Sequence, residues 1–203
     1  MLLKGQNPDG SVIYGAALRT LTGEKECGDG FLFHSTDNHV LIALIDGLGH
    51  GSHAHAAAEA AIEYLKEFAD QPIEPMLQKT HGEMRSNRGA VAFVGKINLS
   101  SKVMECASIG NIGFKLNVKS EKKQYMLPVP GVIGHTLKRI VVNDIELADG
   151  DEIILHSDGI SSRFKPEELE AVDPAERATE IVNRFGYDHD DASVLIVKVD
   201  FKK

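Results

Sequence analysis

The segment Val40–Asp46 (VLIALID) constrains the fold more than any other part of this chain. Its apolar residues do not alternate with polar ones, so a strand formed by this segment must be buried on both faces. A glycine-rich turn follows Asp46, and the apolar residues of Ser52–Phe68 then recur at the spacing of one buried helix face. We therefore expect a central buried strand that leads through a turn into a helix.

Short segments rich in Val, Ile and Phe are separated by turn residues along the rest of the chain, which is typical of β-strands. Two further helices are predicted, one at Ile73–Arg85 with Pro75 in its first turn, and one that begins at an Asp173–Pro174 N-cap and ends near Phe185. Many strands and few, clustered helices indicate an α+β fold with antiparallel sheets; the alternative is a doubly wound parallel sheet. The predicted strands are Ser11–Thr20, Gly30–His34, His39–Ile45, Gly89–Asn98, Lys102–Ser108, Phe114–Lys119, Thr136–Val142, Glu152–His156 and Ser193–Val199, and residues 119–123 (KSEKK) are expected to form a hairpin tip.

Composition excludes several classes of protein. The chain of 203 residues is 42% hydrophobic and 26% charged, values typical of a globular protein, and we expect one domain over residues 1–203. Its formal net charge of −8 argues against binding to nucleic acids or anionic membranes, which requires a basic surface. Met1–Lys4 is no signal peptide, and the longest apolar run, Val40–Ile45, is far too short to span a bilayer. With only Cys27 and Cys106 as cysteines, a reduced, cytoplasmic setting is expected.

The turn Asp46–Ser52 (DGLGHGS) connects the buried strand to the helix. A phosphate-binding nucleotide loop has the same context, but these glycines do not match GxGxxG and no GK[ST] follows. A hard-cation site fits better, because an aspartate at a strand end can reach a metal and glycine lets the backbone approach it. A charge at the end of an apolar strand is also costly unless something binds there. Further carboxylates lie at predicted strand ends, namely Asp29, Asp158, Asp190 and Asp191.

Three histidines, His50, His53 and His55, crowd the start of the predicted helix. A zinc site there is the alternative to a hard-cation site, but His53 and His55 point to different helix faces and no cysteine joins them. We interpret this segment as a solvated helix start, with His50 near the substrate. The cysteines, Cys27 and Cys106, are interpreted as core or near-core residues and not as reactive thiols.

Seven short motifs occur in order along the chain: GD (28–29), DGLGHG (46–51), RGA (88–90), SIGN (108–111), PGVIG (130–134), HSDG (156–159) and DDASV (190–194). The ordered series resembles the PPM-type metal-dependent serine/threonine phosphatases, and most closely their bacterial SpoIIE/RsbX branch. The resemblance covers residues 23–199. It implies a four-layer α-β-β-α sandwich of two antiparallel sheets flanked by helices, with two Mn²⁺ or Mg²⁺ ions bound at one end.

The resemblance also implies roles for individual residues. Asp46 would bridge the two ions, the Gly47 carbonyl would ligate one of them, and the remaining ligands would be Asp29, Asp158 and Asp190. Asp46 and Asp29 are thereby the predicted catalytic residues. Asp191 falls where the family has Asn or Asp, and we expect it behind the ligands.

Next to the metal motifs the sequence departs from the wider family. Leu48 stands where a histidine is common, and Lys25 is the nearest cation upstream of the first acidic motif, where many members have an arginine. The proton donor and the phosphate ligand therefore stay unassigned. The candidates for contacts to the substrate or to the metal ligands are His50, Lys25, Arg88 and Asn111; Arg88 could instead be a surface or capping residue, and Asn111 a turn residue.

The residue types suit hydrolysis of a phosphate monoester, a reaction that is among the slowest in water. Oxygen ligands favour Mg²⁺ or Mn²⁺, and two such ions can activate a water for direct attack on phosphorus. We predict a phosphatase, monomeric, that acts on phosphoserine or phosphothreonine of STAS-domain proteins in a bacterial stressosome or partner-switching pathway. The alternatives are a non-catalytic binding module of the same fold, which should have lost metal carboxylates that this chain keeps, and a metal-dependent hydrolase of small phosphoesters or nucleotides.

Overall fold

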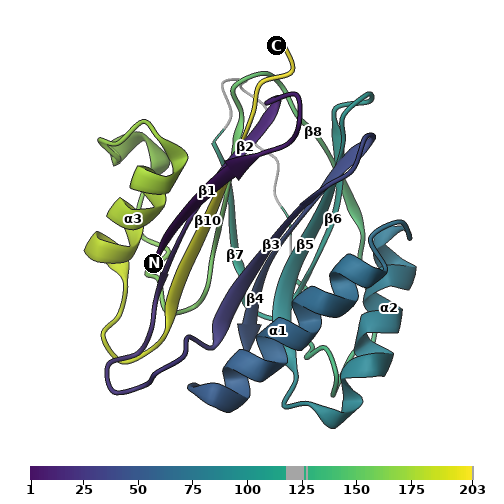
Figure 1. The fold of residues 1–203 in the computed structure, drawn as a ribbon, viewed down its shortest axis with the longest axis vertical. Coiled ribbons are helices and arrows are strands. Elements are labelled where there is room, and N and C mark those ends of the chain that lie inside the picture. Colours follow the sequence, from purple (N-terminus) through teal and green to yellow (C-terminus); the bar gives the residue numbers. More distant parts are fainter. Residues whose placement is uncertain (118–125, 127, 203) are drawn as a thin grey trace.

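The computed structural model describes residues 1–117, 126 and 128–202, which form two antiparallel β-sheets packed face to face (Figure 1). One sheet has the strand order β1-β2-β10-β9-β7 and the other β3-β4-β5-β6-β8. All neighbouring strands within them run antiparallel, which excludes the doubly wound parallel alternative. The first sheet comprises β1 (Leu2–Gln6), β2 (Val12–Arg19), β7 (Gly113–Asn117), β9 (Glu152–His156) and β10 (Ala192–Val199); the second comprises β3 (Asp29–Ser35), β4 (His39–Gly47), β5 (Ala90–Asn98), β6 (Val103–Ile109) and β8 (Asn143–Glu146).

Three α-helices in the described part of the chain cover the outer faces of the sheets (Figure 1). Helices α1 (Ser52–Glu67) and α2 (Ile73–Glu83) pack on the sheet that contains β4, and α3 (Pro174–Phe185) packs against β2 and β10 of the other sheet. The predicted α-β-β-α sandwich is therefore confirmed. None of the helices among these residues is long and apolar enough to cross a membrane.

The central strand β4 is buried on both faces because its side chains alternate between two hydrophobic cores. Leu41 and Ile45 pack in the core that α1 covers, whereas Ile42 and Leu44 pack in the core between the two sheets. By the same alternation, Asp46 continues the row of Ile42 and Leu44. The strand thus delivers a carboxylate to the end of the core between the sheets, where the apolar packing stops.

One predicted strand is wrong, and one observed strand was not predicted. The predicted strand Thr136–Val142 is wrong, because only Thr136 makes a bridge, to Val132, and the regular pairing with β6 is made by the next residues, in β8. Leu137, Ile140 and Val142 of that segment pack onto the α1-side core without strand pairing, whereas Val141 is exposed, so its β-forming composition reflects partial burial. β1 was not predicted, since its short sequence carries no strong alternation. The predicted hairpin tip, residues 119–123, and the end of the predicted strand Phe114–Lys119 lie outside the described residues.

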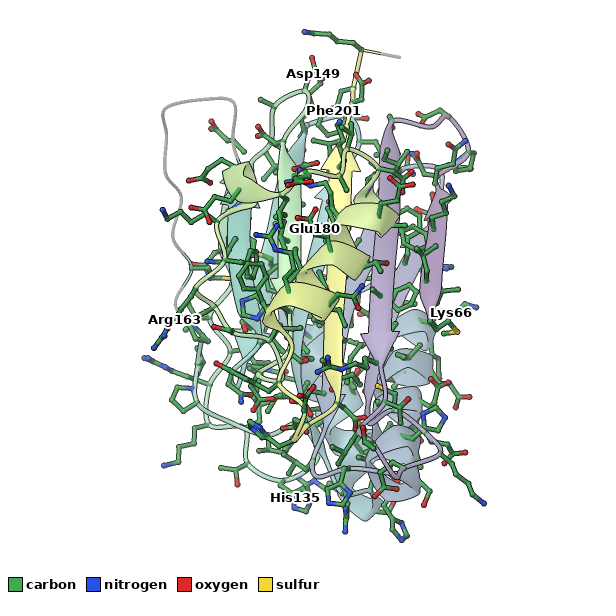
Figure 2. The ribbon with its side chains drawn as sticks, turned by 90° about the vertical axis from the view of Figure 1, so that its left-hand side faces the viewer. Lys66, His135, Asp149, Arg163, Glu180 and Phe201 are labelled. Carbon is green, nitrogen blue, oxygen red and sulfur yellow. The ribbon has the colours of Figure 1, made fainter. Side chains whose placement is uncertain are left out.

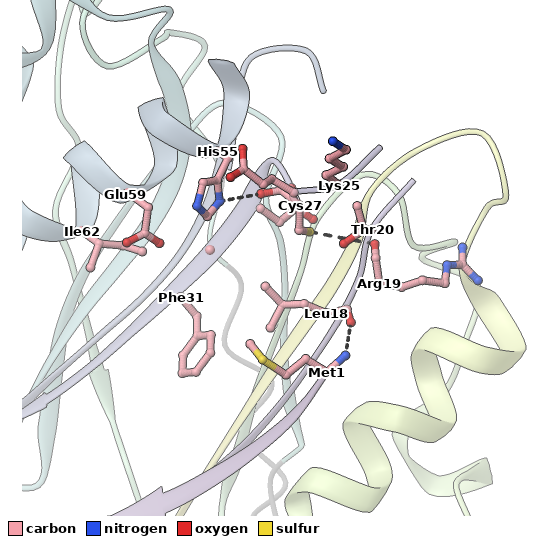
Figure 3. Close-up of a pocket in the computed structure, with 13 residues that line it drawn as sticks. Met1, Leu18, Arg19, Thr20, Lys25, Cys27, Phe31, His55, Glu59 and Ile62 are labelled. Atoms are coloured by element: carbon pink, nitrogen blue, oxygen red, sulfur yellow. Dashed lines mark hydrogen bonds between the residues drawn. The ribbon is translucent and has the colours of Figure 1, made fainter. Parts of the chain in front are cut away.

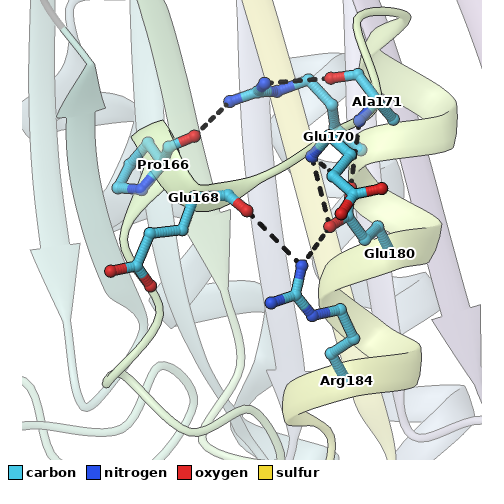
Figure 4. Close-up of polar contacts among 7 residues, drawn as sticks. Pro166, Glu168, Glu170, Ala171, Glu180 and Arg184 are labelled. Atoms are coloured by element: carbon cyan, nitrogen blue, oxygen red, sulfur yellow. Dashed lines mark hydrogen bonds and ion pairs between the residues drawn. The ribbon is translucent and has the colours of Figure 1, made fainter.

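Helix α3 carries a polar clamp that fixes the segment 166–171 (Figure 4). The Arg177 guanidinium donates to the Ala171 and Pro166 carbonyl oxygens, each at 3.0 Å, and faces the Glu152 carboxylate of β9 at 3.4 Å. Both side chains of that ion pair are at most 10% exposed. On the outer side, Glu180 pairs with Arg184 and accepts from the backbone amides of residues 170 and 171. The clamp holds the segment that connects β9 to α3.

The labelled residues in Figure 2 identify the two ends of the sandwich. At one end, the Asp149 carboxylate accepts a hydrogen bond from the Phe201 amide at 2.9 Å. His135 lies at the other end, where Ile133 forms a bridge with Ala90, the register partner of Gly47. β4 therefore ends, and Asp46 lies, at the His135 end.

Candidate metal-dependent active site

The candidate site begins with two aspartates on neighbouring strands. Asp29 opens β3 and Asp46 lies near the end of β4, and the two residues are register partners in the antiparallel pair. Paired residues in such a ladder project to the same face of the sheet. Here that face is the one between the sheets, since Phe31 and Leu44, two positions along each strand, pack in the core there.

The opposite sheet contributes two further aspartates through its loops. Asp158 follows β9, and Asp190 precedes β10. Burial raises the pKa of Asp46, and the charges of Asp29, Asp158, Asp190 and Asp191 add to this effect in that order; together they raise it to about 9. Burial also raises the pKa of Asp190. The four predicted metal-ligand carboxylates therefore lie within electrostatic reach of one another, with Asp46 as their common neighbour.

Asp29 has the most strongly desolvated carboxylate of this group. It is 5% exposed, and its Oδ2 atom has no hydrogen-bond partner. Burial raises its pKa, and the nearby hydroxyls of Ser157 and Ser193 oppose that rise only in part. A buried carboxylate oxygen without a partner is costly unless a cation or a donor occupies the adjacent space.

Gly47 is required by the close packing of β4 against α1. A Cβ atom at this position would lie 2.1 Å from the Ala54 carbonyl oxygen, closer than any real contact. The Gly47 amide donates to the Gly28 carbonyl at 3.1 Å, so the backbone after Asp46 is fixed beside the GD motif. This arrangement lets the main chain approach the carboxylates closely.

Asp191 supports the site through hydrogen bonds to the backbone of the loop before Asp29. It is 3% exposed, its Oδ1 atom accepts from the Leu21 amide and its Oδ2 atom from the Gly28 amide, each at 2.8 Å. Both carboxylate oxygens are thus engaged by the loop that precedes Asp29. The side chain ties the start of β10 to the start of β3.

The four remaining candidates, Lys25, His50, Arg88 and Asn111, are exposed at the surface around the aspartate cluster. Asn111 is the one that contacts a proposed ligand: its Nδ2 atom donates to Asp158 Oδ2 at 2.7 Å. His50 instead pairs with Glu24, at 2.7 Å. Arg88 is exposed above the turn that follows Asp46, with Nη1 3.5 Å from the Leu48 carbonyl oxygen, and Lys25 is exposed on the loop before Asp29.

A cavity of about 560 Å³ opens beside Asp29 (Figure 3). Lys25 lies at its rim, and Phe31 and Ile62 form apolar parts of its wall. A second cavity, of about 400 Å³, borders Asp158 and Asn111. Sequence reasoning missed this second cavity, because apart from Asn111, His156 and Asp158 its lining residues come from segments with no motif.

The histidines do not form a zinc site. His50 is engaged by Glu24, and His55 contacts the Cys27 carbonyl oxygen at 3.0 Å. His53 is exposed. The described residues contain no group of three His, Cys, Asp or Glu side chains that could hold a metal ion as they stand.

The same finding applies to the aspartates, whose side chains are near one another without closing on one point. The residues nevertheless fit divalent cations. All donors are carboxylate oxygens, which hard cations prefer, one of them is buried without a partner, and the charges around Asp46 are all negative among those that shift its pKa. Like charges repel one another, and Asp158 is turned toward Asn111. Cations would remove that repulsion.

The raised pKa of Asp46 predicts an unusual pH dependence of the metal-free protein. The folded state keeps a proton that the unfolded state, with an ordinary aspartate pKa of 3.8, has lost. Stability should therefore fall as pH rises from about 7 to about 9, by up to about 1.4 kcal/mol per pH unit. Saturating Mg²⁺ should abolish the fall, because the ion binds the ionised carboxylates.

Urea unfolding at several pH values, with EDTA or with Mg²⁺, measures this effect. The Asp46→Asn variant is the control and should show a flatter profile without metal. Metal-free stability that is constant or rises from pH 7 to 9 would contradict the proposed crowding of charge.

Fold and site together define a phosphatase of the PPM class: an α-β-β-α sandwich with a cluster of aspartates at one end. The family model of the stage II sporulation protein E (SpoIIE) matches residues 36–200, and the chain belongs to this family. The phosphoserine phosphatase RsbX of Bacillus subtilis (strain 168) is 29% identical over 139 residues, which are 68% of this chain and 70% of RsbX.

Two solved structures are similar over nearly the whole chain. One comes from a study of the bacterial stressosome as a modular system adapted to control secondary messenger signalling; it has a TM-score of 0.87 and 28% identity, over 92% of this chain and 99% of the other. The second is RsbX in complex with magnesium, with a TM-score of 0.86 and 23% identity, over 98% and 100% of the two chains. The fold is therefore that of RsbX.

Proposed function

We propose that this protein is a Mg²⁺- or Mn²⁺-dependent phosphoserine phosphatase with two ions per chain, and that residues 1–203 form one catalytic domain. The observation that carries the proposal is the group of four aspartates at one end of the sandwich, with the buried and unpartnered Asp29 Oδ2 atom among them. Such ions, when bound, polarise a phosphate ester and supply hydroxide at neutral pH. The relationship to RsbX, a phosphoserine phosphatase, supports this activity.

The ligands that we propose are Asp29, Asp46, Gly47 through its carbonyl, Asp158 and Asp190. Asp46 would be the ligand shared by the two ions, as the resemblance to PPM phosphatases implies, and the charges of all four other aspartates raise its pKa. The remaining residues keep these groups in place. Asp191 fixes the loop before Asp29, and the Asn111 amide orients Asp158.

The substrate that we propose is a phosphorylated STAS-domain protein of a bacterial stressosome or partner-switching pathway. The likeness to a chain from a stressosome study, at 28% identity, supports it. We further propose that the protein acts as a cytoplasmic monomer that binds no nucleic acid. Cys27 and Cys106 are free, and burial raises the pKa of both thiols to about 12, so they suit a reduced setting and not redox chemistry.

A turnover assay tests the activity and its metal dependence. The protein is stripped with EDTA and supplied with Mg²⁺ or Mn²⁺, and release of phosphate is measured from a phosphoserine STAS-domain protein. We expect turnover with either ion and none with EDTA. Turnover that persists with EDTA would refute the two-metal site, and its absence with both ions would favour a non-catalytic binding module.

The second alternative, a hydrolase of small phosphoesters, is tested in the same assay. Nucleoside mono-, di- and triphosphates replace the phosphoprotein at equal concentration. We expect kcat/KM to be higher for the phosphoprotein. A higher value for a nucleotide would overturn the protein substrate while leaving the metal-dependent chemistry in place.

A further inference from the structure

The cavity of about 400 Å³ beside Asp158 is lined by a positively charged side chain that the proposed chemistry does not use. Lys115 of β7 lines this cavity together with Asn111 and Asp158. The cavity therefore borders both an aspartate of the cluster and a lysine. It holds far more than one water molecule, whose share of liquid volume is about 30 Å³.

Lys115 is held in place, unlike an ordinary surface lysine. Its Nζ atom donates to the Ser162 carbonyl oxygen at 3.0 Å and lies 4.7 Å from the centre of the Phe164 ring. Phe164 is 1% exposed and packs against His156 and Phe185. The aromatic ring that positions the ammonium group is thus itself fixed in the core.

A fixed ammonium group can bind an anion at low entropic cost. Ordering a free lysine costs up to about 2 kcal/mol of rotamer entropy, and here the fold has already ordered it. An ammonium group has three donors, of which the Ser162 carbonyl uses one. Tyr187 and Ser162, which line the same cavity, are exposed, so the cavity is open to solvent and to a ligand.

We propose that this cavity is a subsite for an acidic side chain next to the phosphoserine of the substrate, with Lys115 as its specificity-determining residue. The proposal rests on the proposed function, because it places the phosphoserine at the aspartate cluster. Asp158 itself borders the cavity, so a residue next to a phosphoserine bound at the cluster, with its Cα about 3.8 Å from that of the phosphoserine, can place its side chain there. A protein with a net charge of −8 otherwise repels acidic segments, and a cation fixed beside the site selects them.

Two fluorescein-labelled phosphoserine peptides test the subsite. One carries glutamate at both positions that flank the phosphoserine, and the other carries alanine there. The wild type with Mg²⁺ should show a kcat/KM about three- to five-fold higher for the glutamate peptide, mainly through a lower KM. The ratio should approach one in Lys115→Met and be retained in Lys115→Arg, which keeps the charge and the stacking on Phe164.

Lys102→Met is the matched control, because Lys102 also lies over an aromatic ring, 5.1 Å from the centre of Phe201, at the opposite end of the sandwich. It should leave the peptide ratio unchanged. A wild-type ratio near one, or an equal loss of the ratio in Lys102→Met, would overturn the subsite.

Fluorescence anisotropy on the Asp46→Asn background, with Mg²⁺, measures the affinity ratio of the two peptides without turnover. If the wild type hydrolyses neither peptide but the affinity ratio depends on Lys115, the proposed function fails and the anion subsite stands. If the wild type hydrolyses both peptides, and the two peptides have equal kcat/KM and equal affinity, the subsite fails and the phosphatase activity stands.

Discussion

Asp46→Asn is expected to lower kcat on a phosphoserine substrate by roughly 1000-fold or more, since changes even to groups behind metal ligands cost about 10–100-fold. Asp46 is the carboxylate with the most acidic neighbours, and we propose that it bridges both ions. An amide keeps the shape of the side chain but supplies neither its charge nor its second anionic oxygen. Both ions should therefore bind more weakly.

The same substitution should not destabilise the metal-free protein. At pH 8 the Asp46 carboxyl group must take up a proton on folding and asparagine needs none, so the free energy of unfolding in EDTA should stay equal or rise. Loss of turnover together with unchanged or higher metal-free stability separates a metal ligand from a residue that merely supports the fold. Isothermal titration with Mg²⁺ measures the loss of affinity directly.

Asp149→Asn is the matched control for this experiment. It also changes the aspartate of an Asp–Gly turn, but Asp149 contacts the Phe201 amide and Lys202 at the opposite end of the sandwich. Its kcat should stay within about two-fold of the wild type, because exposed ion pairs contribute at most about 1 kcal/mol, and to folding alone. An Asp46→Asn variant as active as Asp149→Asn would refute the proposed centre.

Arg177→Ala is expected to cost about 3–5 kcal/mol of stability, the usual effect of removing one partner of a buried ion pair. Arg177 is 8% exposed, faces Glu152 and donates to two backbone carbonyls of the clamped segment (Figure 4). Without it, the buried Glu152 carboxylate loses its facing cation and the Pro166 and Ala171 carbonyls lose donors. In a chain of this length such a loss lowers Tm by roughly 6–20 °C.

Arg184→Ala, about two helical turns further along α3, is the control. Its side chain is 46% exposed, and its ion pair with Glu180 is solvated, so the expected cost is below about 1 kcal/mol. The double variant Arg177→Met with Glu152→Gln should recover part of the loss, because it removes both buried charges. Thermal unfolding measures all of these variants. Equal costs for Arg177→Ala and Arg184→Ala would contradict the assigned role of the buried pair.

The sequence predicted those parts of the fold that local patterns specify. The apolar run of β4 required burial on both faces, and the Asp173–Pro174 pair marked the start of α3, where the Asp173 carboxylate accepts from the Ala175 amide at 2.9 Å. Residues 136–142 misled the prediction, because a β-forming composition indicates burial but does not determine which residues pair with β6. That choice depends on tertiary contacts.

In the candidate site, too, local patterns predicted the residues, whereas their contacts depend on the tertiary structure. Each aspartate could be named from its place at a strand end, but neither the pairing of Asp29 with Asp46 nor the contact from Asn111 to Asp158 follows from spacing alone. Lys115 carried no signal, since a lysine in a strand is ordinary on a solvated face. Its significance comes from Phe164, which lies almost 50 residues later in the chain.

The position of β10 has a consequence for synthesis of the protein. β10 lies in the middle of its sheet, between β2 and β9, and the Asp191 carboxylate before it fastens the loop that precedes Asp29. A nascent chain therefore has a gap inside one sheet, and an unfixed loop before Asp29, until residues 190–199 have left the ribosome. Pairings this distant in sequence form slowly. The aspartates of the two sheets can thus come together only after this late strand has joined its sheet.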